Sequence, residues 1–281
     1  MPRRRADPRQ NGFALVAALW LLLILGILGS SFLRDVRSER ALVTSRVTLV
    51  QARLAADAGI RRAILSLLDT QDRERWRIDG ASRTIALLGQ ACDVAVGSEA
   101  GKIDLNLAPA DLLAALFRTQ QVAPAEADDL AARIVEWRRA VPDGEPDDTL
   151  DPYVAAHRRY GPRHGPFRSI DELRLVIGMS DELQAAVEPL VTVYSRTPTV
   201  RRQAASDQVL AVLAEAGDNL AGIQRDAMAR GAAVGADERP AQGEAIEIRA
   251  RSEVGGLRVV RTAVIRLTGD RREPYWILSW R

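Results

Sequence analysis

The sequence contains one cysteine, two histidines and one lysine, and these low counts exclude several kinds of site. Because Cys92 is alone, no disulfide can form within the chain, and cysteine content does not decide the compartment. With only His157 and His164, an ordinary closed zinc site could not be built without carboxylates. Lys102 is the only lysine, so the positive charge is almost entirely arginine. The net charge is only +2, which gives no argument for a nucleic-acid partner.

Catalytic motifs are also missing from the sequence. It has no serine elbow, no Cys–His pair, no phosphate-binding loop and no spaced metal motif. The acids Asp104, Asp111 and Glu172 are better explained as a turn acid, a first-turn acid and a capping acid. We therefore expect no enzyme activity and assign no catalytic or cofactor-binding residue.

A long apolar run near the start is the most informative stretch. Residues 13–33 carry no charged side chain, and as a helix they would span roughly 30 Å, about one bilayer core. A cleaved secretory signal would have a shorter apolar core, and here charged residues starting at Arg34 follow. Two other interpretations of the run remain. It could be a plain signal anchor, or the chain could be cut just before it, between Gly12 and Phe13. Arginines flank both ends of the run, so charge does not orient the segment.

The helical pattern continues beyond the membrane run as an amphipathic segment, residues 34–70. It has no proline or turn cluster before residue 68, and Gly59 is its one weak point. This pattern predicts one continuous stem, whose lower half enters lipid and whose upper half packs on its own domain. Its apolar residues recur every three or four positions: Val36, Val43, Val47, Val50, Leu54 and Ala58, then Ile64 and Leu68 on a slightly wider stripe.

The remaining chain divides into four segments. Residues 71–100 predict two short strands, with Cys92 as a small apolar strand residue. Residues 101–191 read as an inserted all-α domain, in which Ser169 and Glu172 have capping-box spacing. Residues 192–243 form a degenerate repeat with helices and a loop. Its segment 200–213 echoes 103–116, although chance similarity between alanine-rich segments is an alternative. In residues 244–281 apolar and polar residues alternate, which predicts antiparallel strands. With the helices before them, the predicted class is α+β.

This order of elements resembles the minor pseudopilin K family of the type II secretion system, also called general secretion pathway protein K. The matching residues are spread over nearly the whole chain, and they are specific only together and in this order. They are the leader Gly12-Phe13 with its apolar run, Gly101-Lys-Ile-Asp-Leu-Asn106, Ala108-Pro109 with Leu112-Leu113, Pro166-Phe167 with Ser169-Ile-Asp-Glu172-Leu173, Val176-Ile-Gly178-Met179, Pro189-Leu190-Val-Thr-Val-Tyr194-Ser195, and Tyr275-Trp-Ile-Leu-Ser-Trp280.

The resemblance implies a pilin-like fold, in which a long N-terminal helix lies against an antiparallel sheet that carries the inserted helical domain. It also implies that residues 1–12 are a leader, cut after Gly12 by a prepilin peptidase that then methylates Phe13. The mature protein would lie in the bacterial inner membrane as a single-pass protein, with its C-terminal domain in the periplasm. Residues 13–33 would be its transmembrane segment.

The residue at the fifth mature position supports a place at the end of a filament. Ordinary pilins carry a glutamate there, thought to meet the N-terminal amine of the adjacent subunit, whereas this chain has Ala17. A subunit with nothing above it has no amine to neutralise, and an unpaired carboxylate in lipid would be costly. The resemblance implies a cap on the pseudopilus, shared with the minor pseudopilins I and J and in possible contact with secreted proteins.

An acidic loop is the one candidate metal site. Asp143, Glu145, Asp148 and Asp151 could offer the hard oxygen ligands that calcium prefers, and members of this family can bind calcium in this region. The alternative is a solvated acidic loop between helices, since the spacing is not that of an EF-hand.

Two other functions remain open from the sequence. The helical segment resembles helix-hairpin-helix modules, which would make the chain a membrane-anchored DNA-binding or DNA-uptake protein. The turn after Phe117 lacks the glycine hairpin that holds phosphate in such modules, so we expect no nucleic-acid partner. A minor subunit of a type IV pilus is the other alternative.

Overall fold

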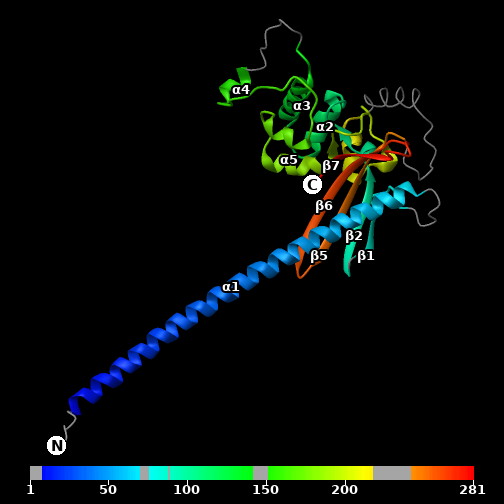
Figure 1. The fold of residues 1–281 in the computed structure, drawn as a ribbon. Helices are drawn as coiled ribbons and strands as arrows, with labels where there is room; N and C mark the ends of the chain where they lie inside the picture. Colours follow the sequence, from blue (N-terminus) through cyan, green and yellow to red (C-terminus); the bar gives the residue numbers. More distant parts are fainter. Residues whose placement is uncertain (1–7, 70–75, 88, 142–150, 218–241) are drawn as a thin grey trace, which may run out of the picture.

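The computed structural model describes the backbone of residues 8–69, 76–87, 89–141, 151–217 and 242–281. The side chains of residues 8–15, 28–42 and 151 lie outside the described set. One long helix, one antiparallel sheet and a group of short helices make up the fold (Figure 1). The sheet and the short helices each have their own hydrophobic core. The α+β class with an antiparallel sheet is confirmed.

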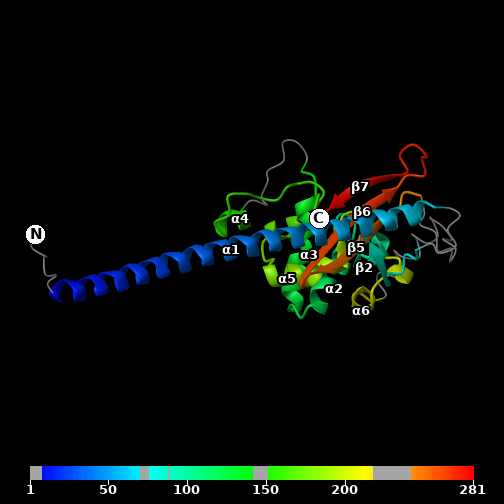
Figure 2. The same ribbon diagram turned by 60° about the horizontal axis from the view of Figure 1, so that its bottom comes forward.

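Helix α1 runs without interruption from Pro8 to Leu68. Its C-terminal part lies across one face of the sheet, and its N-terminal part extends far from every other element (Figures 1 and 2). The continuous stem predicted from the sequence is therefore present. Among the described residues, no helix combines the length and the apolar character that crossing a membrane requires. The predicted transmembrane segment, residues 13–33, falls partly on side chains outside the described set and stays a prediction.

The sheet has five strands in the order β1-β2-β5-β6-β7, and every neighbouring pair is antiparallel. Its strands are β1 (Ser82–Leu87), β2 (Gln90–Ser98), β5 (Ala245–Val254), β6 (Leu257–Leu267) and β7 (Tyr275–Trp280). Strands β1 and β2 are the two predicted before residue 100, and the other three are those predicted after residue 244. Chain segments from both sides of the helical insertion thus form one sheet.

Strand β5 shows why α1 covers one face of this sheet. Ile246, Ile248 and Ala250 are buried in the core that α1 completes, whereas Arg249 and Arg251 between them are exposed. Successive strand residues point to opposite faces, so this alternation makes one apolar and one polar face.

The short helices and connecting strands follow β2 and pack around a second core. They are η1 (Glu99–Gly101), β3 (Ile103–Asp104), α2 (Ala110–Thr119), α3 (Pro124–Arg138), α4 (Asp151–Ala155), η3 (Ile170–Leu175), α5 (Asp181–Val187), η4 (Glu188–Leu190), β4 (Val191–Thr192), η5 (Arg202–Ala204) and α6 (Asp207–Glu215). We call this part, residues 99–217, the helical unit. Leu112, Leu116, Phe117, Leu130 and Ile134 are among its fully buried side chains.

Two predictions about this region need correction. The helical unit is not all-α, because β3 and β4 pair in parallel and bring residue 103 beside residue 191. It also does not end at residue 191, because Val209, Val212 and Leu213 of α6 are buried in the same core as α2. The apolar side of α6 can be buried only against that core, so the segment predicted as a separate repeat completes the unit.

The weak internal repeat has a structural counterpart. Helix α2 begins at Ala110 and α6 begins at Asp207, which are equivalent positions in the two aligned copies, and the two helices contact each other. The predicted helix and loop after residue 217 fall mostly on residues 218–241, outside the described residues.

Candidate functional site

The stem helix approaches the sheet closely through small side chains. Ala52, Ala55, Ala56 and Ala63 of α1 are fully buried. A Cβ atom on Gly59 would lie 2.8 Å from the Sγ atom of Cys92, so nothing larger than glycine fits there without movement. The side chains on this helix face are apolar and small, so the backbone of α1 can lie close to the backbone of the sheet.

Cys92 lies in β2 directly beneath this contact and is fully buried, as expected for a small strand residue. Burial, and then the charge of Asp93, raise the pKa of its thiol. A buried thiol with a raised pKa is a packing residue rather than a nucleophile.

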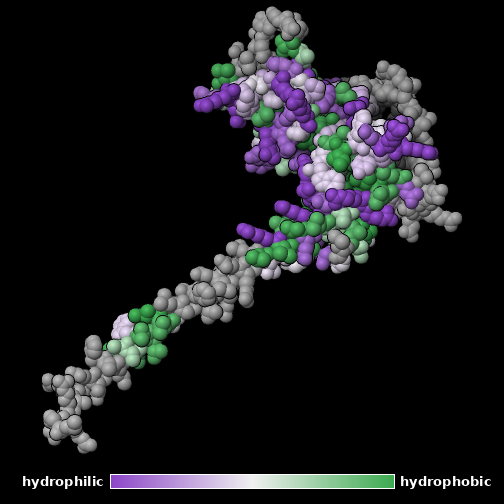
Figure 3. Space-filling model, in the orientation of Figure 1, coloured by the Kyte–Doolittle hydropathy of each residue, from purple (hydrophilic) through white to green (hydrophobic). Residues whose placement is uncertain are grey.

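The opposite side of α1 carries an exposed row of larger apolar side chains. Val43, Val47, Val50 and Leu54 are each 50–59% exposed, and Leu65 further along is 63% exposed. We call the first four the stem stripe; hydrophobic surface along this part of α1 is visible in Figure 3. Their spacing of three and four residues puts them on one side of the helix.

The stem stripe corrects the sequence-based expectation. These four residues were predicted to pack on the protein's own domain, whereas alanines and Gly59 do so instead. Of the other predicted stripe residues, Ile64 is buried in the sheet core and Leu68 packs against it. The exposed part of the predicted stripe therefore lies on the side of α1 that faces away from the sheet.

The C-terminal strand is fastened to the stem through Asp57. Its Oδ1 atom accepts hydrogen bonds from Nε of Arg261 and from the indole Nε1 of Trp280, both at 3.1 Å. The guanidinium of Arg61 lies 5.5 Å from the centre of the Trp280 ring, within the range of a cation–π contact. Three elements, α1, β6 and β7, are thus held in a fixed relation beside the stem.

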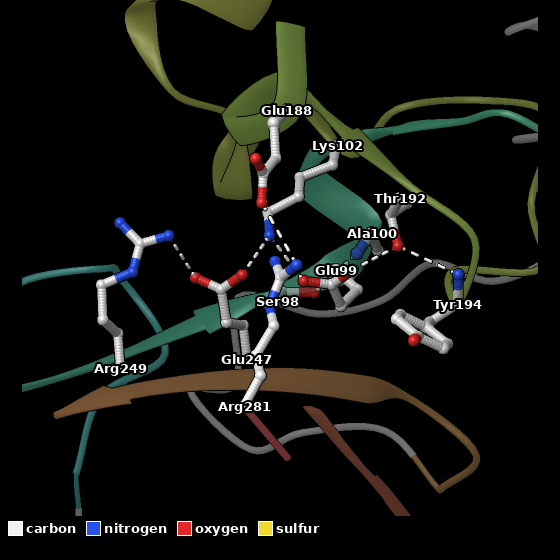
Figure 4. Close-up of polar contacts among 10 residues, drawn as sticks. All are labelled: Ser98, Glu99, Ala100, Lys102, Glu188, Thr192, Tyr194, Glu247, Arg249 and Arg281. Carbon is white, nitrogen blue, oxygen red and sulfur yellow. Dashed lines mark hydrogen bonds and ion pairs between the residues drawn. The ribbon is translucent and has the colours of Figure 1, made fainter. Parts of the chain in front are cut away.

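A buried ionic cluster joins the sheet to the helical unit (Figure 4). The Nζ atom of Lys102 lies 2.7 Å from Oε1 of Glu99 and 2.5 Å from Oε2 of Glu247. Arg249 pairs with the other oxygen of Glu247, and the hydroxyl of Thr192 donates to Oε2 of Glu99. We call Glu99, Lys102 and Glu247 the junction triad.

Electrostatics favour the charged forms of Lys102 and Glu247 in this triad. Burial disfavours the Lys102 ammonium, but the carboxylates of Glu99 and Glu247 outweigh it and raise the pKa of Lys102. Burial likewise opposes ionisation of Glu247, but the Lys102 ammonium and then Arg249 lower the pKa of that carboxyl. Pairing outweighs burial for both groups, so Lys102 and Glu247 join the two units through charged hydrogen bonds.

A second set of contacts strengthens this junction. Oε1 of Glu244, just before β5, accepts from Oγ of Ser98 at 2.5 Å and from Nη1 of Arg201 at 2.8 Å. Arg266 of β6 is also buried, and its Nη2 atom donates to the carbonyl of Tyr194 at 2.6 Å. Side chains at this end of the sheet therefore hold the helical unit in place.

Asp104 organises the first turn of the helical unit and has a larger role than the turn acid predicted. It is 3% exposed, and its two oxygens accept from the backbone N–H of Asn106 and Arg196 and from the hydroxyl of Ser195. Asn106 in turn pairs with both backbone polar groups of Phe167. Motif residues far apart in sequence are thus neighbours in space.

The predicted capping box has a different geometry. Ser169 precedes the 3-10 helix η3 with no side-chain cap bond, and Glu172 instead accepts from the backbone N–H of Arg168 and pairs with Arg163 at 3.0 Å. The acid therefore ties the preceding loop to η3.

The predicted site residues occupy two places. Gly12, Phe13 and Ala17 lie in α1, where Ala17 is exposed and the side chain of Phe13 is outside the described set. Nothing in the structure tests cleavage after Gly12.

The predicted calcium ligands Asp143, Glu145 and Asp148, and the side chain of Asp151, lie outside the described residues. Within the described residues, no group of three or more His, Cys, Asp or Glu side chains could hold a metal ion. The calcium site stays a prediction.

Comparison with known proteins finds a solved structure with a similar fold and a family model that matches the central region of the chain. A chain of the crystal structure of the GspK-GspI-GspJ complex from the enterotoxigenic Escherichia coli type 2 secretion system has a similar fold, with a TM-score of 0.58. The match covers 85% of this chain and 98% of that one, at 16% sequence identity. No curated protein sequence matches. A family model for protein K of the type II secretion system matches residues 95–196, which include the junction triad residues 99 and 102 and the Asp104 turn. The resemblance inferred from the sequence motifs is thus confirmed over residues 95–196, which match the family model for protein K of the type II secretion system.

Proposed function

We propose that this protein is a minor pseudopilin of the type II secretion system, which caps the tip of the periplasmic pseudopilus with the minor pseudopilins I and J. In this role it helps to start assembly of the fibre that exports folded proteins, and it has no catalytic task. The stem stripe is the observation that carries this proposal.

The stem stripe has the properties of a helix-packing surface. Val43, Val47, Val50 and Leu54 follow one another at the intervals that align side chains along a helix, on the side away from the sheet. Burial of such side chains against a second helix is favourable by roughly 25 cal/mol for each Å² of apolar surface. The stems of the I and J subunits are the partners that this surface would fit, as the name of the similar complex suggests.

The N-terminal part of α1 supports an anchor in the inner membrane. All described residues from 16 to 27 are exposed, and none of them is polar. A helix that is apolar on all sides requires a nonpolar surrounding, which lipid supplies. We propose that prepilin peptidase cuts after Gly12, that Phe13 becomes the methylated N-terminus, and that the folded part lies in the periplasm.

Two features support a position at the tip. Ala17 replaces the acid that would neutralise the amine of a neighbouring subunit in lipid. The helical unit adds a large body to the sheet, and the junction triad together with the Glu244 contacts fixes it there. A unit of this size is easily placed at the end of a filament and is difficult to repeat along it.

The test compares two adjacent substitutions on the stem. Val50→Glu places a charge in the stem stripe, and Gln51→Glu places the same charge on the neighbouring exposed position outside it. Each full-length variant is produced together with the I and J pseudopilins of the same system, and the complex is isolated through a tag on I. We expect Val50→Glu to be recovered at least about tenfold less than wild type, as a loss of 1.4 kcal/mol gives.

Gln51→Glu should be recovered at the wild-type level. Equal recovery of both variants would contradict the assignment of the stem stripe as the assembly surface. Circular dichroism of each purified variant checks that the fold is intact.

A further inference from the structure

The stem stripe has the spacing of a coiled-coil seam. Its four residues, Val43, Val47, Val50 and Leu54, follow one another after four, three and four positions. These are the intervals between positions d and a of the heptad repeat abcdefg, along which two helices pack side by side. Each of the four side chains is at least 50% exposed. The stem stripe is therefore shaped for a second helix that runs along α1.

This seam ends where β7 reaches the stem. The next d and a positions are occupied by Asp57 and Arg61. Asp57 accepts a hydrogen bond from the indole N–H of Trp280, and the guanidinium of Arg61 lies over the Trp280 ring. The protein's own C-terminal strand thus covers the continuation of the line. A second helix can follow α1 along the part N-terminal to Asp57, which leads toward the proposed membrane anchor.

The two flanks of the seam differ in charge. Arg46 and Arg53 occupy the g positions on one side of the stripe, whereas Thr44 and Gln51 occupy the e positions on the other side. Both arginines are exposed, and neither forms an ion pair with a residue that the structure describes. Side chains at e and g lie beside the partner helix, and their charges determine partner choice and orientation. The stem therefore presents one basic flank and one uncharged flank to its partner.

We propose that the stem stripe binds the stem of another pseudopilin in parallel, and that this stem carries aspartate or glutamate at the positions facing Arg46 and Arg53. The inference rests on the proposed function, which anchors both stems in the same membrane and so makes the two helices parallel. In a parallel pair a g residue faces an e residue of the partner, so the acids occupy two e positions of the partner stem.

The basic flank gives the stem a means of selecting its partner. A second copy of this chain would place Thr44 and Gln51 opposite the two arginines and would form no ion pair there. A stem with basic e positions would be repelled, whereas the apolar stripe alone would accept any of these stems. The charges therefore distinguish between stems that the apolar residues do not distinguish.

Zero-length cross-linking tests this contact directly, because the only lysine of the chain, Lys102, is enclosed by Glu99 and Glu247. A water-soluble carbodiimide joins a lysine amine to a carboxylate only where the two groups are in direct contact. Arg53→Lys keeps the positive charge and adds an amine beside the seam. Arg62→Lys is the control, because it adds an amine at an exposed position of α1 beyond the end of the seam.

Each full-length variant is isolated together with the I and J pseudopilins and treated with the carbodiimide, and mass spectrometry identifies the linked residues. We expect an amide link from position 53 to an aspartate or glutamate of a partner stem, and no such link from position 62. An isolated complex without a link from position 53, equal links from both positions, or a link to a second copy of this chain would overturn this proposal and leave the proposed function standing. Equal recovery of Val50→Glu and Gln51→Glu would instead contradict the proposed function, and this proposal with it.

Charge reversal provides an independent measurement. Arg53→Glu places a carboxylate beside the partner's acid, so recovery of the complex at low salt should fall about two- to fivefold, the effect of an exposed ion pair. Salt screens exposed charges, so this loss should become smaller at about 0.5 M salt. Arg62→Glu makes the same change in charge and should be recovered at the wild-type level under both conditions. A loss that does not respond to salt, or that is equal in the two variants, would overturn the proposal.

Discussion

Removal of the Lys102 ammonium is expected to destabilise the junction between the sheet and the helical unit. Glu99 is 1% exposed at its side chain and Glu247 is 14% exposed, so Lys102→Met leaves two nearly buried carboxylates without their shared cation. Breaking a buried ion pair by removing one partner costs about 3–5 kcal/mol. We expect a loss of that size in the free energy of unfolding of the full-length protein in detergent at neutral pH.

The loss should depend on pH in a definite direction. The pKa of Glu247 is lowered in the folded protein, so its pairing contributes stability above the unfolded pKa of about 4.3. That contribution is lost as the pH falls through the lower, folded pKa. In Lys102→Met the Glu247 carboxylate takes up a proton more readily, so the stability gap between variant and wild type should narrow as the pH falls toward about 4.

Urea unfolding followed by tryptophan fluorescence and circular dichroism measures this gap. Arg258→Met is the control, because Arg258 and its partner Glu253 are more than half exposed at 3.3 Å and such pairs contribute about 0–1 kcal/mol. The double variant Lys102→Met with Glu247→Gln should be more stable than Lys102→Met alone at neutral pH. A gap below about 1 kcal/mol, or one that does not change with pH, would refute the reasoning about the triad.

Three further outcomes are expected. Gly59→Val should destabilise the protein by about 1–3 kcal/mol through overpacking against β2. Gly26→Val is the control and should change stability little, because no atom lies near the new side chain. Equal effects of the two substitutions in urea unfolding would contradict the close approach of α1 to β2. The Cys92 thiol, buried and with a raised pKa, should react with a maleimide only after denaturant is added, and fast labelling of the native protein would show that it is accessible. Mass spectrometry of the protein from membranes that contain prepilin peptidase should show cleavage after Gly12 and a methylated Phe13. From membranes that lack the enzyme, it should show an uncut chain. An uncut chain in both samples would contradict the pseudopilin processing.

Local patterns in the sequence were sufficient for the elements of the fold. An uninterrupted helical pattern predicted α1, and the alternation of apolar and polar residues after residue 244 predicted the antiparallel strands there. These signals depend only on neighbouring residues, because helix and strand periods are local properties. The motif residues around Asp104 and Phe167 were identified through the family resemblance, which did not predict that they are in contact.

Tertiary structure decided which surfaces meet. The sequence pattern predicted that Val43, Val47, Val50 and Leu54 pack on the protein's own domain. The sheet instead packs against the alanine face around Gly59, because only small side chains permit the helix and the sheet to lie so close together. Hydrophobicity along a helix identifies an apolar side without identifying what covers it.

The same limit applies to the helical unit and the junction. Helix α6 joins the core of α2, and Lys102 lies between Glu99 and Glu247. Both arrangements depend on contacts between residues that are up to 145 positions apart. The order of helices and strands, the single stem and the family motifs were thus determined by the sequence itself. The exposed stem stripe and the junction triad were decided only by the fold, because the triad is made by residues that are distant along the chain and the stripe by a choice between two faces of one helix.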